Sequence, residues 1–277
     1  LLTEQWWQLK AEWVSKIRKL MAPQIRNLFV ARTQLVTPHM KRVTLKGPDL
    51  GDFPSGYEGG YVRALFPKDT GDHTELGALK DRFLMRSYTV RDFRNAAHEL
   101  DLDFVLHGDS GPASRWAETA KEGHPLSIAG PGAVKKPSPQ SDWVLFAGDM
   151  TSLPAIAVNL ENLSKETEGK AIILIESDQD RIDLKEPPKF HVHWITDSDT
   201  KRGTKTLITE FENTTLRGRE PFVWAAGEFE LMRSARKYVK RFDTLSKDSS
   251  YVSSYWKTGE TDEGMKKAKA ALLAADS

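Results

Sequence analysis

The amino-acid sequence predicts a β + α/β protein, in which an antiparallel six-stranded barrel is followed by a doubly wound parallel sheet. Two patterns and the break between them predict this class. Short alternating runs separated by Gly and Pro occupy residues 24–133, and short apolar runs alternate with helical periodicity from residue 143 onward. A Lys- and Pro-containing break at residues 135–141 separates the two patterns. The 277 residues suffice for two domains, each with its own core.

The first pattern indicates six strands and one short helix. Apolar and polar residues alternate in each run, and turn residues bound the runs. We expect the strands at residues 26–36, 40–46, 61–66, 84–93, 99–106 and 126–129. A helix is expected near residues 114–121. Short strands in this number, with one helix, are typical of a small closed barrel.

The second pattern indicates buried strands that alternate with helices. Short, mostly apolar runs predict strands at residues 143–147, 171–176, 192–196 and 222–226. Helices are expected at residues 153–163, 204–212, 228–242 and 262–275. This alternation predicts a parallel sheet. We therefore expect an N-terminal extension over residues 1–22, a barrel domain over 23–136 and an α/β domain over 141–277.

The N-terminal extension has a character of its own. Apolar residues recur at helical spacing among basic ones, at Trp6, Leu9, Trp13, Ile17 and Leu20. Such a helix can rest on a membrane or a partner. A packed leader helix, or an added segment ahead of Met21, is the favoured interpretation.

Composition excludes several classes of function. The formal charge of +1, from 40 basic and 39 acidic residues, argues against a general nucleic-acid binder but allows a local basic pocket. The chain has no cysteine, which excludes disulfides, thiolate metal sites and iron–sulfur clusters. Redox work would therefore need a bound organic cofactor. No apolar run approaches the roughly 20 residues of a membrane span, and no secretory signal is visible, so we expect a cytoplasmic protein.

A strand segment with the sequence Arg-Ser-Tyr-Thr-Val-Arg carries the most chemical information. Arg86 and Tyr88 should share one side of the strand. Ser87, Thr89 and Arg91 should share the other. Guanidinium groups bind phosphate, a tyrosine ring can stack on a flat ligand, and a hydroxyl can bond a ring edge. The segment suits a flavin dinucleotide, although an exposed strand with two solvated arginines remains an equal alternative.

A glycine-containing turn after the following strand is the second informative segment. It runs from His107 through Gly111, Ala113 and Ser114 to Trp116, and it opens the short helix. Free N–H groups at a helix start make a pyrophosphate site. An ordinary capped helix is the better interpretation of this turn taken alone.

Together the two segments resemble the siderophore-interacting protein family, which are FAD-containing ferric-siderophore reductases related to ferredoxin–NADP reductases. The likeness covers about residues 24–264. It continues through Gly-Pro-Gly at 130–132, Ala-Gly-Asp-x-Thr-x-Leu-Pro-Ala at 147–155, Trp-Ala-Ala-Gly-Glu at 224–228 and Tyr-Trp-Lys-x-Gly at 255–259. Each motif is weak alone, but their order and spacing together are specific.

The resemblance implies roles for the matching residues. FAD would be bound by the strand and the turn, at Arg86, Ser87, Tyr88, Thr89, Arg91, His107, Gly111, Ala113 and Ser114. Tyr88 would stack on the isoalloxazine, with Thr89 near its N5 atom. No residue is assigned an acid–base role, because hydride transfer does not require one.

The resemblance also implies a nicotinamide-nucleotide site in the second domain. Gly148, Asp149 and Thr151 follow the first buried strand, and Gly227 and Glu228 follow a later one, where nucleotides bind in α/β sheets. The G-x-G-x-x-G fingerprint is absent, so a plain strand–helix turn has equal weight without the family match.

The end of the next strand leaves the nucleotide undecided. Glu176 and Asp178 could bond ribose hydroxyls and disfavour a 2′-phosphate, whereas Arg181 could do the opposite. The choice between NADH and NADPH therefore stays open.

Ferric siderophores are bulky anions, so their site should be basic. The resemblance assigns this role to Arg63 and Lys257, and Lys135 or Lys136 could complete the set. Each of these residues taken singly is more typical of a solvated surface charge. No protein metal site is expected, since the siderophore already coordinates the iron.

The resemblance therefore implies a ferric-siderophore reductase, which we expect to be a monomer without a membrane segment. Electrons from NAD(P)H, or from ferredoxin, would pass through FAD to siderophore-bound Fe(III), releasing Fe(II) for iron assimilation. One alternative is a general flavin or ferredoxin-linked reductase without siderophore specificity. Another is a siderophore-binding flavoprotein without turnover.

Overall fold

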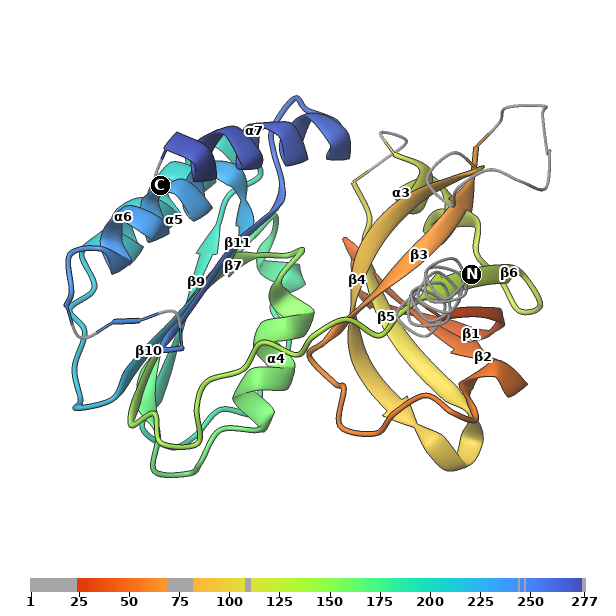
Figure 1. Cartoon of the computed structure of the whole chain (residues 1–277), viewed down its shortest axis with the longest axis horizontal. Coiled ribbons are helices and arrows are strands. Elements are labelled where there is room, and N and C mark those ends of the chain that lie inside the picture. Colours follow the sequence, from red (N-terminus) through yellow and green to blue (C-terminus); the bar gives the residue numbers. More distant parts are fainter. Residues whose placement is uncertain (1–23, 69–81, 108–110, 244, 247, 276–277) are drawn as a thin grey trace, which may run out of the picture.

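The computed structural model describes residues 24–68, 82–107, 111–243, 245–246 and 248–275. The helix expected at residues 1–22 lies outside these residues. Figure 1 shows a barrel and a helix-flanked sheet side by side, with one helix of the sheet facing the barrel. We call them the barrel lobe (residues 25–129) and the sheet lobe (residues 143–275).

The barrel lobe confirms the predicted antiparallel barrel. Its strands close in the order β1-β2-β5-β4-β3-β6. They are β1 (Ile25–Thr37), β2 (Met40–Lys46), β3 (Tyr61–Pro67), β4 (Phe83–Arg94), β5 (Glu99–Val105) and β6 (Pro125–Ala129). The short helix α3 (Pro112–Thr119) lies between β5 and β6, and single turns η1 (Pro48–Leu50) and η2 (Asn95–Ala97) complete the lobe.

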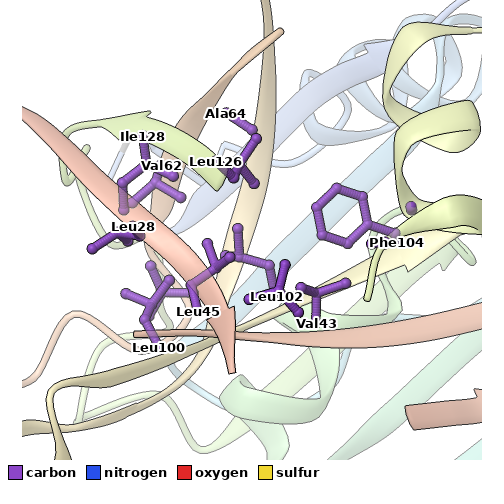
Figure 2. Packing of buried hydrophobic residues seen from close by; sticks show 14 of the residues in the cluster. Leu28, Val43, Leu45, Val62, Ala64, Leu100, Leu102, Phe104, Leu126 and Ile128 are labelled. Carbon is purple, nitrogen blue, oxygen red and sulfur yellow. The ribbon is translucent and has the colours of Figure 1, made fainter. Parts of the chain in front are cut away.

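Alternation along the strands fills the barrel interior. On β1, Leu28 and Val30 are buried while Asn27 and Phe29 face outward, as a period of two requires. Figure 2 shows buried side chains from different strands meeting around the barrel axis. Burying one such side chain stabilises the fold by about 1.5–3 kcal/mol.

The sheet lobe contains five parallel strands in the order β11-β10-β7-β8-β9. They are β7 (Trp143–Asp149), β8 (Glu168–Ile175), β9 (Phe190–Thr196), β10 (Pro221–Glu228) and β11 (Ser250–Trp256). The helices are α4 (Leu153–Glu161), α5 (Thr200–Glu212), α6 (Phe229–Val239) and α7 (Asp262–Ala275), with a single turn η3 (Asp178–Asp180) after β8. One core cluster includes residues of α4, and a second, separate cluster includes residues of α5 and α6, so the sheet is covered on both faces.

Strand β11 was not predicted. Its sequence, Ser-Tyr-Val-Ser-Ser-Tyr-Trp, places three serines among its apolar residues and lacks the continuous apolar run of β7, β8 and β10. The strand nevertheless pairs with β10 over most of its length. It needs no continuous apolar run, because it lies at the edge of the sheet and only part of it is deeply buried.

The two lobes are joined by packing and by hydrogen bonds. Met40, at the start of β2, is 1% exposed and belongs to the core cluster of the sheet lobe, against which Val36 and Val105 also pack. At the tip of the β1–β2 hairpin, the His39 backbone N–H donates to Asp180 Oδ1 over 3.1 Å, and its ring Nδ1 lies 2.8 Å from Oδ2. β4 of the barrel also contacts α4 of the sheet lobe.

Candidate functional site

Among the described residues, β4 and β5 are not paired at one end of the barrel, and we call the region beside their unpaired residues the opening between β4 and β5. β4 pairs with β3 along Phe83–Thr89, but it pairs with β5 only from Val90 onward. The Tyr88 ring lies in the part that has separated from β5, with its centroid 4.1 Å from that of Phe104. Phe104 in turn lies 5.5 Å from the ring of Trp116 on α3. The freed part of β4 and the helix α3 therefore border the same opening.

Arg86 lies on this freed part of β4 and is half-buried. Its Nη1 donates to the carbonyl oxygen of Met85 over 3.1 Å. Its nearest carboxylate among the described residues is Asp262 at the start of α7, at 3.8 Å. This separation is too long for a hydrogen bond, so the guanidinium retains donors for a phosphate. The sequence analysis did not predict that Asp262 lies near Arg86, because the two residues are far apart in the chain.

Helix α3 begins without a side-chain cap. Gly111 occupies the N-cap position in an extended conformation, and Pro112 follows it at the first helical position. The N–H groups of Ala113 and Ser114 belong to the first turn, whose N–H groups have no partner within the helix. The Ser114 hydroxyl accepts a hydrogen bond from the His107 N–H over 3.3 Å, which fixes the turn before the helix. His107 itself is exposed, and residues 108–110 lie outside the described part of the chain.

Arg91 contacts the sheet lobe. Its Nη2 and Nη1 donate to the two carboxylate oxygens of Glu161, over 2.6 and 3.2 Å. A register shift lies between Val90 and Asp92, at this point of β4. Glu161 ends α4, so the ion pair ties the barrel to the helix that faces it. The sequence analysis assigns Arg91 to the FAD site but does not predict its pairing with Glu161.

The two hydroxyl residues of β4 differ in burial. Thr89 is 9% exposed and lies opposite Tyr61 of β3. Ser87 is exposed and lies opposite Arg63, which is also exposed and has Ala129 of β6 as its other neighbour. Ser87 and Arg63 are therefore on the outer surface of the barrel.

The opening has the features that a flavin dinucleotide requires. It offers an aromatic ring at Tyr88, a guanidinium at Arg86 and an uncapped helix start at Gly111. Flat rings pack against aromatic side chains, and pyrophosphate is bound by guanidinium groups and helix N-termini. Burial raises the pKa of Tyr88, which keeps its hydroxyl protonated. The residues present therefore fit FAD.

Asp149 is the last residue of β7, the central strand of the sheet lobe, and lies at the edge of the sheet formed by the carboxyl ends of the strands. Its carboxylate accepts hydrogen bonds from the Thr151 N–H (2.9 Å) and hydroxyl, from the Glu228 N–H (2.9 Å) and from Trp256 Nε1 (2.9 Å). Burial raises the pKa of Asp149, while the bonds from Thr151, Trp256 and Glu228 oppose the rise. Asp149 is 7% exposed, and its hydrogen bonds to Glu228 and Trp256 join β7 to β10 and β11.

Two glycines allow this close approach. A Cβ on Gly148 would lie 1.9 Å from Ser152 Oγ and 2.7 Å from the Ala226 carbonyl oxygen. A Cβ on Gly227 would lie 2.4 Å from Asp149 Oδ2, and the φ of +145° at Gly227 also disfavours other residues. Both glycines are therefore needed to bring the ends of β7 and β10 together.

Glu228, at the carboxyl end of β10, also accepts hydrogen bonds from neighbouring segments. It caps α6 by accepting a hydrogen bond from the Glu230 N–H. It also accepts from the N–H (3.1 Å) and the hydroxyl (3.2 Å) of Thr258, in the turn after β11. The carboxylates of Asp149 and Glu228 thus hold the shape of this edge.

The four cations predicted to attract a siderophore come from separate segments. Arg63 lies on β3, and Lys135 and Lys136 are exposed in the segment between the lobes, where the Lys135 carbonyl oxygen accepts from Trp224 Nε1. Lys257 follows β11. Its Nζ lies 3.4 Å from Glu260 Oε1 and 5.6 Å from the centroid of the Phe229 ring.

None of the helices among the described residues is both long and apolar enough to cross a bilayer.

Two family models match successive parts of the chain. One, described as a siderophore-interacting FAD-binding domain, matches residues 29–135, and the other, described as siderophore-interacting protein, matches residues 141–259.

Known proteins align with nearly the whole chain. The ferric vibriobactin reductase ViuB of Vibrio cholerae is 30% identical over 248 residues, which cover 86% of this chain and 91% of ViuB. The crystal structure of the siderophore-interacting protein SipS from Aeromonas hydrophila has a TM-score of 0.81 at 32% identity, covering 91% of this chain and 99% of SipS.

A more distant structure shares the fold alone. A ferredoxin NADP+ reductase from Neisseria gonorrhoeae, with bound FAD and NADP, has a TM-score of 0.57 at 13% identity and covers 84% of this chain and 99% of its own. The barrel and sheet lobes thus form a ferredoxin–NADP reductase-like fold. From the two family models and the relatives aligned over almost their full lengths, this chain belongs to the siderophore-interacting protein family and contains its FAD-binding domain.

Proposed function

We propose that the protein is a ferric-siderophore reductase, in which electrons from NADH or NADPH reach siderophore-bound Fe(III) by way of FAD on the barrel lobe. The observation that carries the proposal is the opening between β4 and β5, where Tyr88, Arg86 and the uncapped start of α3 lie together. The similarity to ViuB, whose name is that of a ferric vibriobactin reductase, supports the choice of substrate.

FAD would supply the conversion between a two-electron hydride and the single electrons that Fe(III) accepts. Arg86 and the N–H groups of Ala113 and Ser114 would bind its pyrophosphate. Tyr88 would present its ring to the isoalloxazine, and Thr89 would hydrogen-bond the ring edge. Arg91, which bonds Glu161, would reach the pyrophosphate only if it exchanged that partner.

The nicotinamide nucleotide would bind at the carboxyl ends of β7 and β10, where the strand order of the sheet reverses. Gly148 and Gly227 would allow close approach of the backbone, and Thr151 would line the site. Asp149 and Glu228 would act through shape, because their carboxylates already accept bonds from the protein.

The ferric siderophore would be attracted by Arg63, Lys135, Lys136 and Lys257. We expect the charge reversal Lys257→Glu to raise the KM for an anionic ferric siderophore by roughly fivefold or more, because it replaces attraction by repulsion. Lys205→Glu, an exposed change on α5, is the matched control. Steady-state rates at low ionic strength measure the effect. An unchanged KM, or loss of the FAD absorption spectrum, would contradict the role of Lys257.

The proposed donor is tested by mixing the FAD-loaded protein anaerobically with NADH, NADPH or a reduced ferredoxin and following the flavin absorbance. We expect a nicotinamide nucleotide to bleach the flavin in a saturable manner. Bleaching by ferredoxin alone would replace the proposed donor while leaving the siderophore role in place.

A further inference from the structure

The carboxyl end of β8 carries acidic side chains that face solvent. β8 is the second strand of the sheet lobe and lies beside β7. In doubly wound sheets an acid at this position hydrogen-bonds the ribose hydroxyls of a dinucleotide. Glu176 and Asp178 occupy the position and are exposed, with side-chain exposures of 44% and 70%.

Asp178 holds the arginine that could bind a phosphate. Its Oδ1 accepts from Arg181 Nη2 over 2.6 Å and from the Thr196 hydroxyl over 2.7 Å. Hydrogen bonds from Thr196 and then Arg181, together with the positive charge of Arg181, hold the pKa of Asp178 below its ordinary value, so the group is ionised at neutral pH. Both bonds use Oδ1, and Oδ2 remains an acceptor for a ribose hydroxyl.

The remaining charged groups of this turn do not supply a second phosphate ligand. Asp180 is buried and bonds both the Ser177 N–H and His39 of the barrel hairpin. The other ring nitrogen of His39, Nε2, lies 3.6 Å from Glu176 Oε1. This turn and the hairpin tip therefore bring three carboxylates together with the Arg181 guanidinium and the His39 imidazole. Each of these two basic side chains already contacts a carboxylate.

We infer that Glu176 and Asp178 make this protein selective for NADH over NADPH. The inference rests on the proposed nucleotide donor. Asp178 would accept a hydrogen bond from a free 2′-hydroxyl of the adenosine ribose. A 2′-phosphate carries two negative charges and would meet two carboxylates, with Arg181 already neutralised by Asp178.

Calorimetric titration of the FAD-loaded protein with ADP-ribose and with 2′-phospho-ADP-ribose tests the inference without any redox step. We expect ADP-ribose to bind about tenfold tighter or more. The variant Asp178→Ser should reduce that ratio to about threefold or less, because it removes the charge and frees Arg181. Glu168→Gln, at the opposite end of the same strand, should leave the ratio unchanged.

Equal or tighter binding of the phosphorylated ligand would overturn the inference, as would an unchanged ratio in Asp178→Ser. Either result leaves the nucleotide donor itself in place. If neither ligand binds and neither NADH nor NADPH bleaches the flavin, the proposed donor fails, and the selectivity fails with it.

Discussion

Replacing Arg86 with alanine is expected to raise the Kd for FAD by about 10- to 150-fold, as hydrogen bonds from a charged group contribute about 1.5–3 kcal/mol. Arg86 lies in the opening between β4 and β5, and its closest carboxylate among the described residues is 3.8 Å away. Its donors are therefore available to a phosphate. Fluorescence titration of the apoprotein with FAD measures the effect.

Arg32→Ala is the matched control for this experiment. Arg32 is another barrel arginine, 55% exposed, which pairs with Glu99 at 2.9 Å on the outer surface. Its removal should leave the Kd for FAD unchanged. Arg86→Lys should recover part of the affinity, because a lysine keeps the charge but loses the planar fork of donors. If Arg86→Ala binds FAD within twofold of the native protein, Arg86 does not hold the cofactor.

Asp149→Ala is expected to lower the free energy of unfolding by about 3 kcal/mol or more, because each buried donor left unsatisfied costs about 1–3 kcal/mol. The change would strand the N–H of Glu228 and the Nε1 of Trp256, as well as both donors of Thr151. These groups hold β7, β10 and β11 together at the edge where the nucleotide is proposed to bind. Guanidinium unfolding followed by tryptophan fluorescence measures the loss.

Asp142→Ala provides the comparison that isolates burial. Asp142 also accepts two backbone N–H bonds, from Arg219 (2.8 Å) and Glu220 (3.0 Å), but it is exposed. Water can replace the lost acceptor there, so we expect a loss of about 1 kcal/mol. Equal losses in the two variants would show that Asp149 is not the structural centre of the sheet edge.

The barrel strands could be predicted because their residues alternate strictly between the interior and the outer surface. The six predicted strands match the observed ones to within a residue at each end. β11 could not be predicted in this way, because an edge strand that is only partly buried does not need a continuous apolar run.

The sequence indicates the segments of the proposed site but not the contacts between them. The strand containing Arg86 and Tyr88 and the turn before α3 border one opening. Their residue types indicate that each segment could bind part of the same ligand, but their distance apart in the sequence does not show that they lie together. Arg91 meets Glu161, 70 residues further along the chain.

The hydrogen-bond partners of Asp149 and Glu228 in the sheet lobe could not be predicted from the sequence either. Asp149 and Glu228 have the residue types and positions of nucleotide ligands. Their carboxylates instead accept bonds from Trp256 and Thr258, which reach them only after the chain has formed β11. Sequence position alone does not distinguish a buried acceptor from an exposed one.

The central claim is that this protein passes electrons to siderophore-bound iron. The most direct test is to reduce the FAD-loaded protein without oxygen, mix it with a ferric siderophore in a stopped-flow instrument and follow the return of the flavin absorbance, with a ferrous-specific chelator present. We predict a reoxidation rate that rises with siderophore concentration and one Fe(II) released per electron. Reoxidation no faster than in buffer, across catecholate and hydroxamate ferric siderophores, would contradict the claim.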